Sequence, residues 1–390
     1  MMAQEKLRIW GGEGNRSGIM VEGDILTHTP DGVDINDLWR EFVRANTVYN
    51  EHKEGFVGLL TYAVLSDIEL VPQIGDFSFE VATEQGIPRG QNTNISYYQL
   101  AYAYQDYDLR LGYTWKFLRD APSEQIEAIH TKAIQADQAL VFRKTMEALF
   151  DNRTRETIIN SMTYDVHPLA NADGWKPPSY KNVDFDGTHN HYLTSGATTV
   201  DSGDFEDAVN HLTEHGYGWD TGTQIVCFAN RAQINNIRKW RFGQVSANGV
   251  TANYDFIPAL GQPAMLVPNA EGLLGGQAPS TWNGLRVTGA YMDVMIIEEP
   301  LMPPGYMLFL STGGVNVDEN IVGIREHSSP SWRGLKLMPG NQQRYPLIDG
   351  YYVHGFGTGI RRRTGAVIMQ ITDNASYTIP AQYAHSTATR

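Results

Sequence analysis

The most regular pattern of apolar and polar positions in the chain lies between Ser123 and Phe150. Apolar residues recur there at alternating three- and four-residue steps, the period that places side chains on one face of an α-helix: Ile126, Ile129, Ala133, Ala136 and Leu140. Pro122 suits a first helical turn, and the acidic Glu124 and Glu127 favour the positive end of the helix dipole. At 1.5 Å per residue the predicted helix is roughly 40 Å long. We expect this helix to organise the chain.

The first 49 residues of the chain contain two patterns. Residues 1 to 35 are rich in Gly and Asp without a sustained period, which indicates an extended arm. Asn36–Tyr49 carries Leu38, Phe42 and Ala45 at helical spacing, which predicts a short amphipathic helix capped by Asn36.

Apolar residues alternate from Val71 to Leu118, as they do in strands. The predicted outward strand carries Phe77, Phe79 and Val81, and the return strand carries Tyr98, Leu100, Tyr102 and Tyr104. Between them, Glu84–Asn94 contains Gly and Pro and reads as the tip of a long hairpin. The aromatic side chains need cover, either from the chain's own core or from a partner subunit, and spacing alone leaves both open.

The second half of the chain mixes helices and strands. Residues 164–200 are irregular and predict a connector. We then expect helices over Asp204–His215 and Arg231–Trp240, and strands over Thr223–Phe228, Ala264–Val267, Leu285–Thr288, Val294–Ile297 and Tyr306–Leu310. Near the end of the chain, Tyr351–Ile360 and Ala366–Ile371 are predicted to be neighbouring strands joined across Arg361–Gly365.

Composition narrows the class of protein. The chain has 390 residues, 42% of them apolar, which fits two or three globular domains. Its net charge of −14 argues against a surface that grips nucleic acid. The single cysteine, Cys227, lies in an apolar run and is expected to be a buried thiol. No apolar stretch resembles a signal peptide or a membrane span, so we expect a soluble, non-secreted protein without a membrane partner.

Two histidine-containing segments are candidates for metal chemistry. His211, Glu214 and His215 match the H-x-x-E-H pattern of inverted zinc metallopeptidases, although His215 before Gly216 is also what a helix C-terminus favours. Asp184–His191 holds two carboxylates and two imidazoles, but the spacing fits neither a calcium loop nor a two-histidine zinc site, and a polar turn is favoured. No G-x-S-x-G nucleophile motif occurs, and the glycine run Gly11–Gly18 lacks the Lys of a phosphate loop. The sequence therefore predicts no catalytic, cofactor-binding or metal-ligating residue.

The order of arm, long hairpin, long helix, mixed domain and β-rich return resembles the major capsid proteins of tailed bacteriophages, which have the Hong Kong 97-type fold. Local segments add to the likeness, especially with capsid proteins of phages of actinobacteria, and together they cover most of the chain from residue 36 to 380: Leu111–Asp120, His189–Leu193, Gly284–Gly289, Ile297–Gly305 and Gly355–Arg363. The fold class that the resemblance implies is α+β.

The resemblance also implies a domain organisation. It gives an N-terminal arm with a short helix at 1–70, an extended loop at 71–118, a peripheral domain at 119–200 and 324–390 with its spine helix at 123–150, and an axial domain at 201–323. The extended loop of this family lies over a neighbouring subunit, which favours the intersubunit reading of the hairpin. The residues expected at intersubunit contacts are Phe77, Phe79, Glu84, Arg89, Tyr98, Tyr102 and Tyr104 in the loop and Arg361, Arg362 and Arg363 in the peripheral domain.

The implied function is structural. The chain is expected to assemble, without catalysis or cofactors, into hexamers and pentamers of an icosahedral shell around double-stranded DNA, in a virion put together in the host cytoplasm. Separate scaffolding and portal proteins, with decoration proteins as an optional addition, are the expected partners, because only about 120 residues precede the spine helix. The namesake's lysine crosslink is not expected, since Gln73–Tyr113 contains no lysine. Two alternatives remain: an encapsulin-like shell, and a zinc-dependent hydrolase that uses His211, Glu214 and His215.

Overall fold

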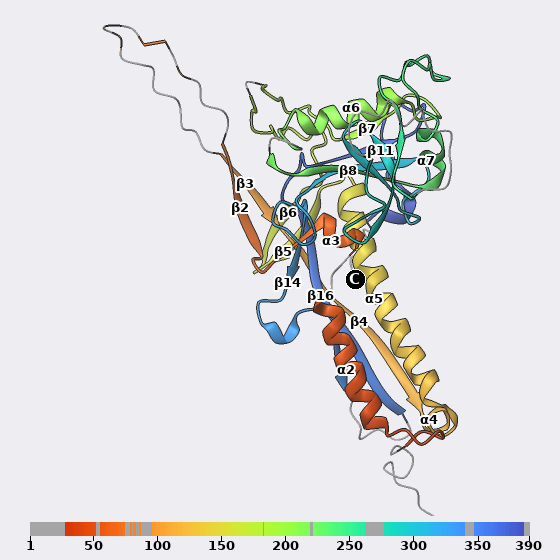
Figure 1. Ribbon diagram of the computed structural model, residues 1–390. Coiled ribbons are helices and arrows are strands. Elements are labelled where there is room, and N and C mark those ends of the chain that lie inside the picture. The colour runs from red at the N-terminus through yellow and green to blue at the C-terminus, as the bar shows by residue number, and fades with distance from the viewer. Residues whose placement is uncertain are drawn as a thin grey trace, which may run out of the picture. The chain divides into compact units, whose positions relative to one another are not determined.

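The computed structural model describes residues 28–51, 55–74, 79, 81–82, 84, 86, 96–181, 183–218, 221–261, 277–339 and 347–385. These residues form two compact units. The first unit comprises the described parts of Met1–His52, Asp106–Ala139 and Trp332–Gly355, and the second comprises those of Lys53–Gln105, Leu140–Ser331 and Phe356–Arg390. Strand β4 (Ala103–Thr114), helix α5 (Ser123–Phe150) and strand β16 (Leu347–Ile360) each begin in one unit and end in the other (Figure 1). No helix in these ranges is long and apolar enough to cross a bilayer.

The first unit combines helices with short strands. Its elements are α2 (Ile35–Glu51), α4 (Trp115–Asp120), β15 (Lys336–Pro339) and the adjoining parts of α5, β4 and β16. Strand β15 pairs antiparallel with β16, and β4 also pairs with β16. An apolar cluster of Leu38, Phe42, Leu118 and Ile126 holds the helices together.

The long helix α5 has the predicted bounds, but its buried face differs from the prediction. Within the first unit its buried positions are Ile126, His130, Ala133 and Asp137, which follow steps of four, three and four residues. Ala136, expected on this face, is exposed. A pattern search for apolar residues misses this stripe because two of its four members are polar.

Helix α2 also begins differently from the prediction. The Asp34 carboxylate accepts the Asn36 N–H (2.8 Å), so Asp34 and not Asn36 satisfies the first turn. On the buried side, Leu38 and Phe42 are followed by Asn46, whereas Ala45 is exposed.

The second unit is built on a large mixed sheet. Its strand order is β10-β11-β12-β8-β13-β17-β7, with β9 beside β11. The strands are β7 (Tyr192–Thr194), β8 (Gln224–Ala229), β9 (Ile257–Pro258), β10 (Thr281–Trp282), β11 (Leu285–Tyr291), β12 (Val294–Glu298), β13 (Tyr306–Thr312) and β17 (Ala366–Gln370). The predicted helix at Arg231–Trp240 is the shorter α7 (Arg231–Ile237), and the predicted strand at Ala264–Val267 lies outside the described residues.

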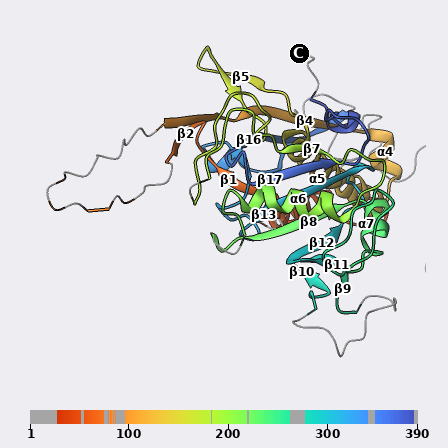
Figure 2. The ribbon, with the colours of Figure 1, turned by 90° about the horizontal axis from the view of Figure 1, so that it is seen from above.

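Both faces of this sheet are buried, because successive residues of a strand point to opposite sides. In β8, Ile225 and Cys227 join a core with helices α6 (Ser202–Thr213) and α7, while Val226 and Phe228 join a second core with α3 (Phe56–Leu60) and the last turns of α5. Figure 2 shows α6 lying across the sheet, next to strands β13 and β8. Burial raises the pKa of the Cys227 thiol, as the predicted inert thiol requires.

A smaller sheet has the order β1-β14-β16-β15, with β4 also on β16. Strand β1 (Thr61–Val64) runs parallel to β14 (Val322–Glu326), and β14 runs antiparallel to β16. The prediction that Tyr351–Ile360 and Ala366–Ile371 are neighbouring strands is wrong, since β16 belongs to this sheet and β17 lies between β13 and β7 in the other. The turn at Arg361–Gly365 carries the chain from one sheet to the next.

Two hairpins complete the second unit. Strand β2 (Ile68–Gln73) pairs with β3 (Ser96–Ala101), so the outward strand lies earlier than the predicted Phe77–Val81. Strand β5 (Arg155–Ile159) pairs with β6 (Met162–Val166). The remaining elements are the 3-10 helices η3 (Pro330–Trp332) and η4 (Ala381–Tyr383).

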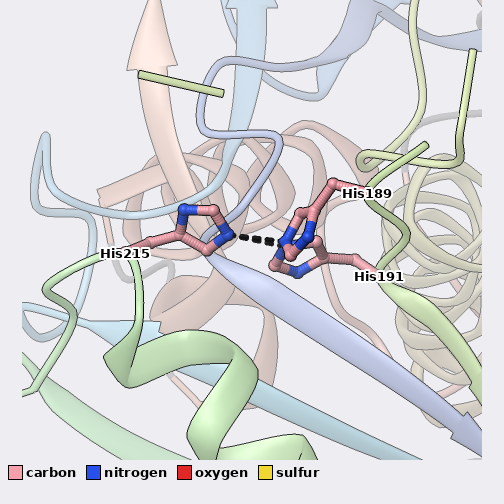
Figure 3. Close-up of side chains that lie close together, drawn as sticks. All are labelled: His189, His191 and His215. Carbon is pink, nitrogen blue, oxygen red and sulfur yellow. Dashed lines mark hydrogen bonds between the residues drawn. The ribbon is translucent and has the colours of Figure 1, made fainter. Parts of the chain in front are cut away.

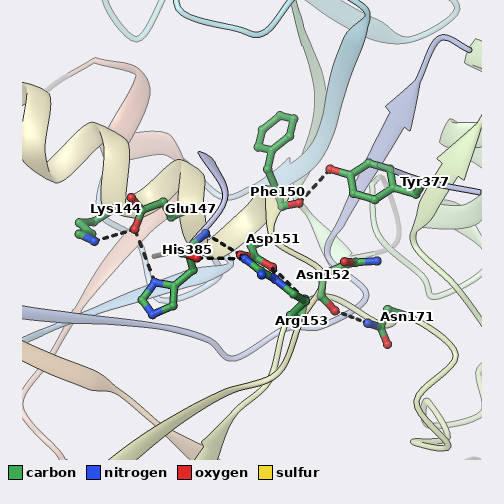
Figure 4. Close-up of polar contacts among 9 residues, drawn as sticks. All are labelled: Lys144, Glu147, Phe150, Asp151, Asn152, Arg153, Asn171, Tyr377 and His385. Atoms are coloured by element: carbon green, nitrogen blue, oxygen red, sulfur yellow. Dashed lines mark hydrogen bonds and ion pairs between the residues drawn. The ribbon is translucent and has the colours of Figure 1, made fainter. Parts of the chain in front are cut away.

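The C-terminal segment closes the end of α5 (Figure 4). The Tyr377 hydroxyl donates to the Phe150 carbonyl (2.9 Å), and Asp151 accepts the His385 N–H (2.7 Å). Glu147 is buried and accepts a hydrogen bond from Lys144 Nζ (2.7 Å). The Tyr377 bond satisfies a backbone carbonyl that the end of the helix leaves without an intrahelical partner.

Candidate assembly surfaces

The β2–β3 hairpin has two faces of different character. The register places Val71 opposite Tyr98 and Glu69 opposite Leu100. On this inner face, Tyr98 and Leu100 are 6% and 0% exposed and pack with Tyr62 of β1. The inner face therefore belongs to the core of the second unit.

The outer face of the hairpin carries apolar side chains in solvent. Pro72 lies opposite Tyr97 and Leu70 opposite Gln99, so these residues point away from the inner face. Leu70 is 63% exposed and Tyr97 is 62% exposed. Further along the chain, the described residues Ile74, Phe79 and Val81 are also exposed large apolar side chains. We call Leu70, Ile74, Phe79, Val81 and Tyr97 the outer apolar set.

The structure corrects the predicted intersubunit role of Tyr98 and Tyr102. Tyr102 is 0% exposed, its hydroxyl lies 3.1 Å from that of Tyr62, and its ring covers Gly323, where an added Cβ would lie 2.5 Å from a ring carbon. The prediction assigned the aromatic stripe to the wrong face, since a shift of one residue exchanges the two faces of a strand. Sequence reasoning missed Leu70 and Tyr97 for the same reason.

The other predicted loop residues divide into three cases. Phe77 and Arg89 lie outside the described residues. Phe79 and Glu84 are exposed. Tyr104 is half-buried, with the Arg325 guanidinium 4.4 Å from its ring centroid, so its ring packs within the chain.

The three consecutive arginines all bind partners in their own chain. Arg361 pairs with Asp318 (2.7 Å), and Arg362 Nη1 donates to the Asn320 carbonyl (3.0 Å). Both side chains bind the segment at Asp318 and Asn320 of their own chain, and both remain partly exposed.

Arg363 is the third arginine, and it is 2% exposed. It donates to the Pro168 carbonyl (2.9 Å) and pairs with Asp173 (2.5 Å). Burial opposes ionisation of Asp173, but the hydrogen bond and charge of Arg363 outweigh it and lower the pKa of that carboxyl. The predicted intersubunit role of Arg363 is corrected, because a buried, fully engaged guanidinium is a structural ion pair of the connector.

The H-x-x-E-H motif does not form a zinc site of the metallopeptidase kind. His211 Nδ1 lies 2.9 Å from the Asp207 carbonyl one turn earlier on α6, so it donates there, and Glu214 is exposed. His215 faces His189 and His191 from the connector, not His211. The connector itself contains the expected polar turn, in which Asp186 accepts the N–H (2.8 Å) and the hydroxyl (2.6 Å) of Thr188.

Comparison with known proteins identifies the class. No protein-family model matches the chain, and no curated protein does. A solved structure from Mycobacterium phage Patience is 48% identical, with a TM-score of 0.75, and the match covers 96% of this chain and 98% of that one. The capsid of an empty GTA particle (12% identity, 81% and 90% coverage, TM-score 0.47) and the holo-SrpI encapsulin complex from Synechococcus elongatus (11%, 82% and 88%, 0.42) are more distant.

These findings define a capsid protein with the α+β Hong Kong 97-type fold. The chain belongs to the family of tailed-bacteriophage major capsid proteins, and it forms the icosahedral shell of a virion. The encapsulin alternative is not favoured, because the 48% identical structure comes from a phage.

Proposed function

We propose that the chain forms hexamers and pentamers of a shell that encloses double-stranded DNA without sequence-specific binding, and that it does so in the host cytoplasm without catalysis. Separate scaffolding and portal proteins complete the particle in this proposal, and decoration proteins are an optional addition. The net charge of −14 supports a container that does not hold its genome by phosphate contacts.

The observation that carries the assembly proposal is the outer apolar set on and beyond the β2–β3 hairpin. A two-stranded hairpin is marginal in water, yet this one exposes Leu70 and Tyr97 on the face away from its own core. Exposed apolar groups of this kind mark interaction sites. The occupant in this proposal is a second copy of the chain, because a shell repeats the same surface in every subunit.

The domain assignments stay proposals. Residues 71–118 act as the extended loop, 119–200 and 324–390 as the peripheral domain, and 201–323 as the axial domain. Support for an axial domain comes from α6, α7 and strands β8, β11, β12 and β13, which contribute side chains to one apolar core. Of the predicted contact residues, Phe79, Glu84, Arg361 and Arg362 keep the proposed intersubunit role. Leu70 and Tyr97 join them, and Phe77 and Arg89 stay predictions because they lie outside the described residues.

The assembly surface is tested with Leu70→Asp and Tyr97→Asp. Both side chains are exposed in the single chain, so we expect folded subunits with circular dichroism like that of the wild type and no shells in negative-stain micrographs. The conservative variants Leu70→Val and Tyr97→Phe serve as matched controls and should form shells. Normal shells from both aspartate variants would overturn the proposed contact.

A buried residue gives the opposite control. Tyr98→Asp places a charge in the inner core, so we expect loss of soluble folded subunits and not only loss of assembly. A soluble, folded Tyr98→Asp protein that forms no shells would mean that the two faces of the hairpin are reversed.

The predicted absence of a lysine crosslink has its own test. Gln73–Tyr113 contains no lysine, so the loop offers no amine for an isopeptide bond. Boiled particles should run on a denaturing gel as a single 43.6 kDa band. A ladder of covalent oligomers would show that another crosslink holds the shell.

A further inference from the structure

Three histidines in the second unit point their Nε2 atoms at one another, as Figure 3 shows. The histidine cluster consists of His189 and His191, which precede β7, and His215, which follows α6. The distances between Nε2 atoms are 3.1 Å for His189 to His191, 3.2 Å for His191 to His215 and 2.8 Å for His215 to His189. Three nitrogen atoms therefore surround one point.

The tautomer of His191 is fixed by its other nitrogen. His191 is 0% exposed, and its Nδ1 lies 2.8 Å from the Ala366 carbonyl of β17. A carbonyl only accepts, so Nδ1 carries the hydrogen and donates it. In the neutral ring the Nε2 then holds a lone pair that is directed at the other two histidines.

Hydrogen bonds among the three rings cannot satisfy all three contacts. In a neutral imidazole each Nε2 is either a donor or an acceptor, never both. Around a triangle these roles cannot alternate, so at least one pair must oppose two hydrogens or two lone pairs. The geometry therefore needs something other than hydrogen bonds at its centre.

Protonation does not remove the conflict. In every protonation state each Nε2 presents either a hydrogen or a lone pair, so three Nε2 atoms that face one another cannot all be paired. Three neutral rings with converging nitrogens are the donor set that imidazole-binding metals prefer.

We propose that His189, His191 and His215 bind one divalent transition-metal ion, with Zn²⁺ as the first candidate. Zinc–imidazole bonds are about 2.0–2.1 Å long, which puts the nitrogens of a tetrahedral site roughly 3.3–3.4 Å apart, within a few tenths of an ångström of most distances here. An all-nitrogen set excludes Ca²⁺ and Mg²⁺, which require oxygen ligands. His189 and His215 are only half-buried, so a water molecule completes the fourth position.

The ion joins two segments that the sheet alone does not connect. His189 and His215 are 26 residues apart, at the end of the connector and at the end of α6. The His191–Ala366 bond adds the orienting partner that metal-bound histidines normally have. The role is structural and independent of the proposed assembly surface: zinc fastens the connector and α6 to one another beside strand β17.

The proposal differs from the sequence prediction, which named no metal-ligating residue. It also differs from the H-x-x-E-H zinc motif. The motif joins His211, Glu214 and His215 within one helix, whereas the structure joins His215 to two residues of the connector. In the described part of the chain these three histidines are the group whose ligand atoms converge, and His211 is not a member. The two donor sets share only His215, so His211 and His189 allow a direct test.

The first experiment measures the metal itself on full-length protein made without a histidine tag. The protein is stripped with 1,10-phenanthroline, dialysed, loaded with zinc at micromolar free concentration and analysed by inductively coupled plasma mass spectrometry. We expect one zinc per chain, and with Co²⁺ in its place the visible absorption bands of a four-coordinate site. Zinc below one-tenth equivalent in the wild type would overturn the proposal.

The second experiment assigns the ligands. His189→Gln and His215→Gln should each weaken zinc binding by more than the roughly 10–100-fold that loss of an orienting partner costs. His211→Gln is the matched control, with the same substitution on the same helix end, and should bind zinc like the wild type. Zinc retained by both His189→Gln and His215→Gln, or lost in His211→Gln but not in His189→Gln, would refute the assignment. If a variant does not fold, the wild-type stoichiometry and cobalt spectrum still decide the question.

Discussion

Two sites in this chain, one in each unit, differ in the atoms that their histidine nitrogens face. In the first unit, His354 Nδ1 lies 2.7 Å from Asp137 Oδ1, and Tyr49 donates to Asp137 Oδ2 (2.9 Å). We call Asp137, His354 and Tyr49 the Asp137 network. The histidine cluster of the second unit has three nitrogens and no carboxylate. The same residue type therefore serves an ion-pair network in one unit and a metal-like donor set in the other.

The difference shows that burial alone does not assign a role to histidine. In the Asp137 network, the His354 Nδ1 and the Tyr49 hydroxyl each donate to a separate oxygen of the Asp137 carboxylate. The histidine cluster offers acceptors that face acceptors, so it is complete only with a cation. The two groups differ because donors meet acceptors in the Asp137 network but not among the three histidines. The number of histidines does not explain the difference.

The largest effect should follow from Asp137→Ala. This change leaves His354 and Tyr49 without their shared acceptor in a buried place, and we expect the free energy of unfolding to fall by about 3–5 kcal/mol. Urea unfolding of unassembled subunits, followed by circular dichroism, measures it. Glu127→Ala, on the exposed side of the same helix, is the control and should stay within about 0.5 kcal/mol of the wild type. A loss below 1 kcal/mol for Asp137→Ala would show that the network adds little stability.

Sequence reasoning could predict α5 to the residue because its helical period runs unbroken and Pro122 precedes it. It could not predict that the buried stripe includes His130 and Asp137, since polar residues enter a core only when partners distant in sequence meet them. His130 meets Tyr352 and Asp137 meets His354, both more than 200 residues away.

The sequence also did not reveal which strands pair with each other or which face of a strand is buried. Two runs of β-forming residues separated by a turn predict a hairpin, but β16 and β17 join different sheets because each finds its neighbours far along the chain. The inner face of β3 was misassigned because alternation gives two faces without saying which one meets the core. The histidine cluster was missed because a motif search compares residues within one helix, while its members lie up to 26 residues apart.

The next effect separates the two histidine groups by their response to zinc. At free zinc of 100 times the dissociation constant, binding should raise the wild-type free energy of unfolding by about 2.7 kcal/mol. His189→Gln should lose that gain and resemble the metal-free wild type. His354→Gln should be less stable than the wild type by the same amount with and without zinc. Equal zinc responses in the wild type and His189→Gln would remove the distinction drawn between the groups.

A smaller effect concerns acid and a second buried histidine of the first unit, His130. It stacks on Phe42 with ring centroids 4.2 Å apart and meets the Tyr352 hydroxyl, and burial lowers its pKa from the ordinary value of 6.5. Below pH 6.5 the unfolded chain therefore binds a proton that the folded chain does not bind. Stability is present above that pH and is lost as the pH falls, by at most about 1.36 kcal/mol per pH unit from this one group.

The variant His130→Phe keeps the ring stack and removes the titrating group. Urea midpoints from pH 7.5 to pH 5, with a chelator present to exclude metal effects, should fall less steeply for His130→Phe than for the wild type. His211→Gln, which changes a partly exposed histidine of the second unit, is the control and should keep the wild-type slope. Identical slopes in all three proteins would mean that His130 contributes no acid sensitivity.

The smallest effect compares two phenylalanines, one in each unit, whose rings stack on a histidine. Phe42 stacks on His130 and is buried, whereas Phe185 stacks on His215 with ring centroids 4.1 Å apart and is half-buried. Ring pairs contribute about 0.5–1.5 kcal/mol beyond the area they bury, so Phe42→Leu should cost about 1 kcal/mol and Phe185→Leu less. Because the Phe185 ring donates no ligand atom, Phe185→Leu should still bind one zinc per chain. A Phe185→Leu protein that bound no zinc would mean that ring packing, and not the convergence of three nitrogens, creates the site.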